Sequence, residues 1–237
     1  MTQYKKDWHE GIGMHAPINP EDYYAPVGPD HTLHKRGAKV LTGSNPYPLN
    51  PQGFQEAVEA YVDIMKHLGM ATMRAIAMGL GLDEHFFDDK MDNGFWVLRL
   101  IGYPPLSTNT DNSEGGISCG QHTDYGCLTI LNTDDTPDAL QVLSKSGEWI
   151  TANPIPGAFV INIGDMLNIW TNNRYTATLH RVIHGGQNYR VSIPFFFEPN
   201  FDTIVAPIPG IGDGQDRYSS VMYGDHLLGK VSNNFQL

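Results

Sequence analysis

The chain has 237 residues, of which 41% are hydrophobic and 17% are charged, and its formal net charge is −11. This length is enough for one domain with a substantial core, so we expect a single domain over residues 1–237. The negative charge argues against electrostatic binding to nucleic acid or to an anionic membrane.

Two cysteines are present, Cys119 and Cys127, and no Cys/His spacing typical of a zinc site occurs. A disulfide framework is therefore not indicated. No apolar stretch is long enough to span a bilayer, and the start of the chain, "MTQYKKDWHEGIGMH", lacks the apolar core of a signal peptide. These features predict a cytoplasmic protein, whereas the sequence gives no indication of its oligomeric state.

The first part of the chain divides into an irregular and a helical segment. Residues 1–50 are rich in proline, glycine and asparagine, which predicts a loop-rich arm. Residues 51–90 carry apolar residues at three-to-four spacing, which predicts one long helix followed by a short one. We expect Asn50 to cap the long helix, Pro51 to occupy its first turn and Gly69 to bend it.

From residue 95 onward the chain consists of short runs rich in β-branched and aromatic residues. Gly, Pro, Asn and Asp separate these runs at intervals of roughly 8–12 residues, a spacing typical of a closed or sandwiched β architecture. We assign the β core to residues 95–205 and a C-terminal tail to residues 206–237. The runs are "FWVLRLIGY", "CLTIL", "LQVLS", "EWITA", "AFVINI", "MLNIW", "ATLHRVIH" and "YRVSIPFFFE".

A candidate metal site begins in "GQHTDYGCLTIL". If this segment is extended, His122 and Asp124 project to the same side of a strand and can bind one ion. A lone pair of this kind is more often a surface histidine beside a solvated aspartate, so a third ligand is needed. The later strand "YTATLHRVIH" offers His180 or His184, and the spacing alone leaves both open. Two histidines and one carboxylate form the facial arrangement of non-haem Fe(II) oxygenases.

A candidate anion site follows in "YRVSIPFFF". Arg190 and Ser192 share one face of this strand, and a buried guanidinium needs a negative partner. A guanidinium can bind a carboxylate through two hydrogen bonds, and a hydroxyl can add a third. Arg99, in "LRLIGY", is either an inward polar contact or, as is more usual, a salt-bridged strand residue.

These parts occur in an order that resembles the iron/2-oxoglutarate-dependent dioxygenase family, in its isopenicillin N synthase-like branch. The chain is also similar to plant 2-oxoacid-dependent dioxygenases. The resemblance covers residues 95–201 through five segments: "LRLIGYPP", "GQHTDYGCLTIL", "ALQVLSKSGEWITANPIPGAFVINIGDML", "NNRYTATLHRV" and "YRVSIPFFFEPN".

The resemblance implies a mainly β fold with flanking helices, a distorted double-stranded β-helix (jelly roll) with one long helix packed outside. It implies Fe(II) as the metal and 2-oxoglutarate as the cosubstrate. The family pattern selects His180 over His184. By the same pattern, the metal ligands are His122, Asp124 and His180, and the residues that bind the distal carboxylate of 2-oxoglutarate are Arg190, Ser192 and Tyr103.

The function that the resemblance implies is oxidation of a C–H bond of a small organic substrate, with release of succinate and carbon dioxide. The outcome is hydroxylation, desaturation or cyclisation, and the sequence does not identify the substrate. Three alternatives stay open at this point. They are an Fe(II) oxidase of the same fold that does not consume 2-oxoglutarate, a truncated non-catalytic β-barrel binding protein, and a zinc hydrolase that uses the same ligands.

We also make one prediction for each end of the chain. Family members usually begin with several tens of further residues, and "DWHEGIGMHAPI" resembles a stretch that lies inside relatives. We therefore expect the N-terminal family segment to be missing and a sheet edge or apolar surface to be uncovered. The end of the chain, "YGDHLLGKVSNNFQL", is expected to fold back over the mouth of the barrel.

Overall fold

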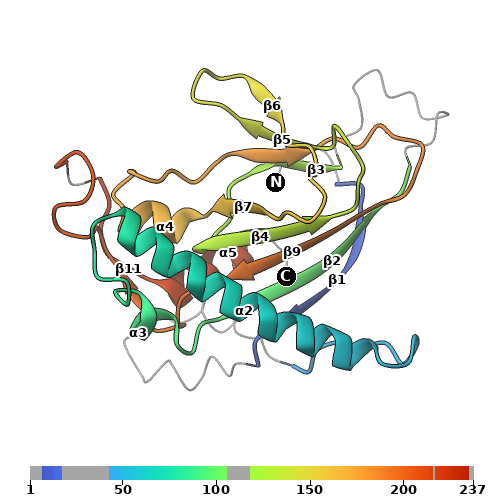
Figure 1. The fold of residues 1–237 in the computed structure, drawn as a ribbon, viewed down its shortest axis with the longest axis horizontal. Coiled ribbons are helices and arrows are strands. Elements are labelled where there is room, and N and C mark those ends of the chain that lie inside the picture. Colours follow the sequence, from blue (N-terminus) through green and yellow to red (C-terminus); the bar gives the residue numbers. More distant parts are fainter. Residues whose placement is uncertain (1–6, 18–42, 106–117, 216, 235–237) are drawn as a thin grey trace.

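The computed structural model describes residues 7–17, 43–105, 118–215 and 217–234 (Figure 1). The strands are β1 (Glu10–His15), β2 (Trp96–Tyr103), β3 (Cys119–His122), β4 (Leu128–Thr133), β5 (Leu140–Leu143), β6 (Trp149–Thr151), β7 (Val160–Ile163), β8 (His180–Val182), β9 (Arg190–Phe197), β10 (Ile204–Val205) and β11 (Val221–Met222). The helices are α2 (Phe54–Gly79), α3 (Asp88–Met91), α4 (Asp165–Trp170) and α5 (Tyr223–Asn234).

Two sheets form the body of the molecule (Figure 1). One has five strands in the order β1-β2-β9-β4-β7, and the other has four in the order β3-β8-β5-β6. Between β3 and β9 the chain passes back and forth between the two sheets, except that β5 and β6 form a hairpin within the four-stranded sheet, and the pairings within both sheets are antiparallel. This alternation is the arrangement of a double-stranded β-helix, so the predicted jelly roll is confirmed.

One strand lies in the region that we predicted to be a loop-rich arm. β1 pairs with β2 at the edge of the five-stranded sheet, with Ile12 opposite Leu100 and Met14 opposite Leu98. Met14 is fully buried. The prediction is wrong for residues 10–15, because the glycines in "GIGMH" hide the alternation of Ile12 and Met14. Residues 18–42 of the predicted arm lie outside the described residues.

The long helix α2 crosses the outer face of the five-stranded sheet, as predicted (Figure 1). The helix is continuous through Gly69, where we had expected a bend. A Cβ atom at Gly69 would lie 2.6 Å from the ring of Phe197, and the missing side chain lets the helix approach the sheet closely. The cap prediction is wrong. The helix begins at Phe54 after Gly53, whose φ is 82°, and no side chain caps it.

The run "MLNIW" forms helix α4 and not the strand that we predicted. Met166, Leu167 and Trp170 are buried, a spacing that suits one face of a helix as well as a buried strand. Asp165 lies in the first turn, where a carboxylate is favoured by the helix dipole. Gly164 has an extended backbone and is the single residue between the end of β7 and the start of α4.

The predicted tail contributes to the hydrophobic core. In α5, the side chains of Leu227, Leu228 and Val231 are buried in the same cluster as those of α2 and β9. Lys230 Nζ lies 3.3 Å from the Asp165 carboxylate, which joins α5 to α4. The expectation that the tail folds back over the mouth of the barrel stays a prediction, and the last residues of the tail, 235–237, lie outside the described residues.

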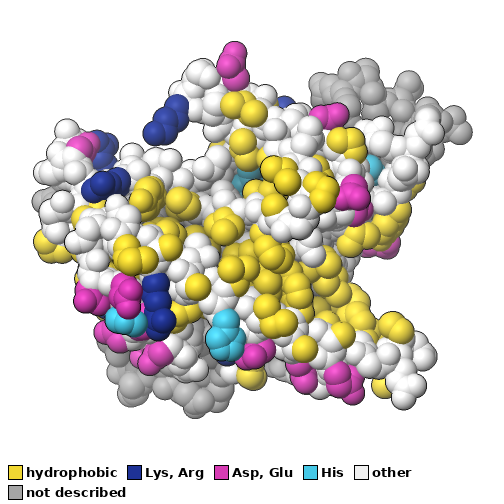
Figure 2. Space-filling model, viewed as in Figure 1, with side chains coloured by type: hydrophobic (Ala, Val, Ile, Leu, Met, Phe, Trp, Pro, Cys, Tyr) yellow, Lys and Arg dark blue, Asp and Glu magenta, His cyan; other side chains and the backbone are white. Residues whose placement is uncertain are grey.

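Part of the five-stranded sheet carries apolar surface. β1 and β7 are its edge strands, and hydrophobic side chains gather on the face of the molecule beside α2 (Figure 2). Exposed hydrophobic side chains include Ile64 on α2, Ile161 on β7 and Val191 on β9. None of the described helices combines the length and hydrophobicity needed to cross a membrane.

Candidate metal centre

The two predicted histidines meet across a strand pair. His122 on β3 and His180 on β8 are direct Cα partners, and their ring centroids lie 4.3 Å apart. Asp124 follows β3, and its Oδ1 lies 3.8 Å from His122 Nε2 and 3.7 Å from His180 Nε2. One ligand atom from each of these three residues lies within 4.8 Å of the other two, so the three residues form a group that could hold a metal ion.

Backbone carbonyls set the orientation of both imidazoles. His122 Nδ1 lies 2.7 Å from the Gly120 carbonyl, and His180 Nδ1 lies 3.0 Å from the Thr178 carbonyl. Because a carbonyl only accepts, each Nδ1 donates its proton, and each Nε2 keeps a free lone pair for a metal. Burial and the neighbouring His180 lower the pKa of His122, which favours the neutral imidazole that metal binding requires.

Two side chains that the sequence analysis did not identify hold the carboxylate in place. Thr129 on β4 and Asn162 on β7 each donate a hydrogen bond of 2.6 Å to Asp124 Oδ2. They reach the same oxygen because they are Cα partners in the five-stranded sheet. The other oxygen, Oδ1, is left to face the two imidazoles. The sequence signal that could have identified them is a single polar residue inside each apolar strand, "LTIL" and "VINI".

The turn that carries Asp124 is fixed by the start of α4. The amide of Asp165 donates to the carbonyl of Asp124, and the amide of Met166 donates to that of Gly126. A Cβ atom at Gly126 would overlap the carboxylate of Glu198, so glycine is required at this close approach. The segment "HTDYG" is therefore held by its backbone as well as by its side chains.

The predicted anion site contains a buried guanidinium that is only partly hydrogen-bonded. Arg190 is 1% exposed, and its Nη2 donates to Thr133 Oγ1 at 3.2 Å. Its Nε and Nη1 have no partner among the described residues. Tyr103, the Cα partner of Arg190, lies with its ring centroid 5.0 Å from the guanidinium carbon. Burial raises the pKa of Tyr103 to about 12, so its hydroxyl keeps its proton. Ser192 is also buried, two residues along the same strand face.

One cavity of about 270 Å³ brings the two predicted sites together. Its apolar wall includes Leu131, Leu140, Val182 and Phe196. Its lining also contains the six predicted site residues, which are His122, Asp124, His180, Arg190, Ser192 and Tyr103.

The structure separates the two histidines that spacing could not. His184 is 1% exposed and does not line the cavity. Its Nε2 lies 2.7 Å from the Asn188 carbonyl, and its amide donates to Ser118 Oγ. His184 is therefore a buried, hydrogen-bonded residue, and His180 is the histidine beside Asp124.

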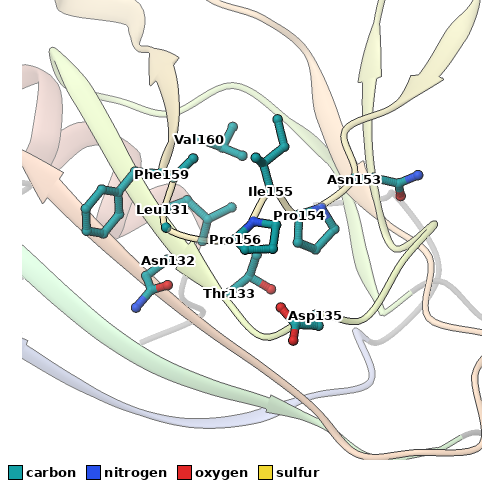
Figure 3. Close-up of a pocket in the computed structure, with 12 residues that line it drawn as sticks. Leu131, Asn132, Thr133, Asp135, Asn153, Pro154, Ile155, Pro156, Phe159 and Val160 are labelled. Atoms are coloured by element: carbon teal, nitrogen blue, oxygen red, sulfur yellow. The ribbon is translucent and has the colours of Figure 1, made fainter.

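A second cavity, of about 310 Å³, lies beside the first and is lined by β4 and residues 153–160 (Figure 3). Leu131, Pro154 and Pro156 project into it, and Asp135 is its one ionisable lining residue. It contains none of the predicted metal ligands. Of these two cavities, only the first is lined by the predicted metal ligands. Cys119 and Cys127 are both free thiols, consistent with the absence of a disulfide framework.

Comparison with known proteins identifies the family. A model of the 2OG-Fe(II) oxygenase superfamily matches residues 94–199. The homoarginine-6-hydroxylase 2-ODD-C23 of Glycine max is 44% identical over 99% of this chain and 70% of its own length. The homoarginine-6-hydroxylase 2-ODD-C23.1 of Arabidopsis thaliana is 42% identical over 100% of this chain and 70% of its own. A full-length Neurospora crassa protein, solved in complex with alpha-KG and thymine, has a TM-score of 0.80 and 29% identity, over 98% of this chain and 67% of that one.

These matches agree with the predicted family, fold and cosubstrate. The chain belongs to the 2OG-Fe(II) oxygenase superfamily, and it is an enzyme that uses Fe(II), dioxygen and 2-oxoglutarate to oxidise a small organic substrate.

Proposed function

We propose that His122, Asp124 and His180 bind the iron, and that Arg190, with Ser192 and Tyr103, binds the distal carboxylate of 2-oxoglutarate. Two neutral imidazoles and one carboxylate suit Fe(II) and leave open positions on an octahedral ion. Iron with bound 2-oxoglutarate supplies the activation of dioxygen, in which the cosubstrate becomes succinate and carbon dioxide.

The observation that carries the cosubstrate assignment is the unpaired part of the Arg190 guanidinium. Two of its nitrogens are buried without a partner among the described residues, in the cavity that contains the three proposed metal ligands. Leaving a buried charged donor unpaired is costly, and a carboxylate can accept from both nitrogens at once. The Thr133 hydroxyl already accepts from the third nitrogen, which fixes the plane of the guanidinium.

The apolar wall of the cavity keeps water away from the reacting groups. Leu131, Val182 and Phe196 line it together with the proposed metal ligands. Excluding water strengthens the electrostatic interaction between Arg190 and a carboxylate, and it limits side reactions of an activated oxidant.

For the substrate, we propose homoarginine or a closely similar amino acid, hydroxylated on its side chain. The support is the 42–44% identity to two plant homoarginine-6-hydroxylases over nearly the whole of this chain. The net charge of −11 also favours the approach of a cationic substrate over an anionic one.

The iron and 2-oxoglutarate sites can be tested without turnover. We expect Fe(II) followed by 2-oxoglutarate, added without oxygen, to give a weak visible absorption band in the parent protein. His180→Ala should lose the band, because one of three ligands is removed. His67→Ala should retain it, since His67 is an exposed histidine on α2 and serves as the matched control. An unchanged band in His180→Ala would refute the ligand assignment.

Turnover separates the remaining alternatives. With homoarginine, we expect one succinate for each dioxygen consumed and a hydroxylated product by mass spectrometry. Oxygen consumption without succinate would indicate the Fe(II) oxidase alternative. Binding of both ligands without any product from amino acids would refute the substrate assignment and leave the iron and 2-oxoglutarate sites intact.

A further inference from the structure

A second arginine lies in the same cavity as Arg190. On β2, Arg99, Ile101 and Tyr103 alternate toward the cavity, and all three line it. Tyr103 is the Cα partner of Arg190, whereas Arg99 is four residues away along the strand. At about 3.3 Å per residue, the backbone positions of Arg99 and Tyr103 are about 13 Å apart. Arg99 therefore marks a different part of the cavity from Arg190.

Arg99 has no counter-charge in the part of the chain that the structure describes. No hydrogen bond or ion pair to its guanidinium is found there, so the salt-bridged interpretation of this residue is not supported. By contrast, Arg74 pairs with Asp88, and Arg217 pairs with Asp213. An arginine without a partner on a cavity wall is available for a ligand.

The charges of the cavity leave Arg99 unbalanced. Asp124 is the one acidic residue among those that line it. In the proposed complex, the two charges of Fe(II) are matched by Asp124 and the metal-bound carboxylate of 2-oxoglutarate. The distal carboxylate matches Arg190. One positive charge remains, that of the half-buried Arg99.

We propose that Arg99 binds a carboxylate of the primary substrate, and that it makes the enzyme selective for carboxylic acids such as α-amino acids. The inference rests on the proposed iron and 2-oxoglutarate sites. A carboxylate can accept two parallel hydrogen bonds from the guanidinium, which fixes the direction in which the substrate lies. A neutral analogue leaves the half-buried cation of Arg99 without a counter-charge, so it should bind more weakly than the acid.

The test compares a carboxylic acid with its uncharged amide. Calorimetric titration without oxygen, on the full chain loaded with Fe(II) and 2-oxoglutarate, measures the binding of L-homoarginine and of L-homoarginine amide. We expect the parent protein to bind the acid about 10- to 100-fold more tightly than the amide. Arg99→Met should bind the two about equally, and Arg99→Lys should keep part of the preference. Arg174→Met, which removes an exposed arginine, is the matched control and should keep the full preference.

Each outcome of the titration supports or overturns the role of Arg99 in binding the substrate carboxylate. Equal binding of acid and amide by the parent protein, or binding of neither, overturns the role of Arg99. If Arg99→Met still prefers the acid to the amide as strongly as the parent protein does, the role of Arg99 is also overturned. The same holds if Arg99→Met keeps this preference but binds 2-oxoglutarate more weakly. If Arg99→Met does not fold, the parent protein and Arg99→Lys still give the comparison. The absorption band of the parent protein with Fe(II) and 2-oxoglutarate is measured before the titration. If the parent protein gives no band, the proposed function itself is refuted.

Discussion

Replacing Arg190 with methionine should stabilise the ligand-free protein while removing its response to 2-oxoglutarate. Two guanidinium nitrogens are buried without partners among the described residues, and each such donor costs about 1–3 kcal/mol. Loss of the hydrogen bond to Thr133 removes about 1 kcal/mol of stabilisation. In the ligand-free protein, where neither 2-oxoglutarate nor substrate fills the cavity, water that enters it offsets part of this cost. We therefore expect a net gain of about 1–3 kcal/mol, since methionine preserves most of the side-chain length.

Urea unfolding measures the stability of the ligand-free protein, and thermal unfolding measures its response to 2-oxoglutarate. At a 2-oxoglutarate concentration of about 100 times Kd, binding stabilises the parent protein by about 2.7 kcal/mol. This corresponds to a rise in Tm of about 5–10 °C for a chain of this size. Arg190→Met should show no rise, and Arg174→Met should match the parent. An Arg190→Met protein that is less stable without ligand and still responds to 2-oxoglutarate would show that the guanidinium is paired in the native state.

Three further predictions concern the surroundings of the site. Thr129→Val should weaken metal affinity about 10- to 100-fold, as measured by titration with Fe(II), because Asp124 loses one of its two orienting hydrogen bonds. Burial and the charge of Asp124 raise the pKa of Glu198 from 4.5 to about 8, so stability should fall as pH rises between those values, by up to about 5 kcal/mol. Glu198→Gln should flatten that profile in urea unfolding, and a slope that stays unchanged would contradict the assignment. Gly69→Ala should lower the free energy of unfolding by about 1–3 kcal/mol, since the new methyl group overlaps Phe197.

The candidate metal site could be predicted because strand periodicity places alternate residues on one face. The choice between His180 and His184 needed the family pattern, since both have the same parity. In the fold, the pairing of β3 with β8 decides the choice, because His122 lies directly opposite His180. His184 lies beyond the end of β8, where it bonds to the carbonyl of Asn188.

The residues that orient Asp124 could not be predicted, because their contact depends on register. Thr129 and Asn162 are far apart in sequence and meet only because β4 and β7 pair with these residues opposite each other. A shift of either strand by one residue would turn that strand's polar side chain away from the cavity. The error at α4 has a similar origin, since a short apolar run fits a helix or a strand until its neighbours fix the choice.

The position of the site between two sheets leads to a final prediction. His122 and His180 belong to the four-stranded sheet, while Thr129 and Asn162, which hold Asp124, belong to the five-stranded one. Any local opening that separates the sheets must therefore release a bound metal. At a metal concentration of about 100 times Kd, amide exchange through such openings should slow about 100-fold in β3, β8, β4 and β7. The short helix α3, remote from the site, should be unaffected. Protection confined to β3 and β8 in hydrogen-exchange mass spectrometry would mean that the metal does not couple the two sheets.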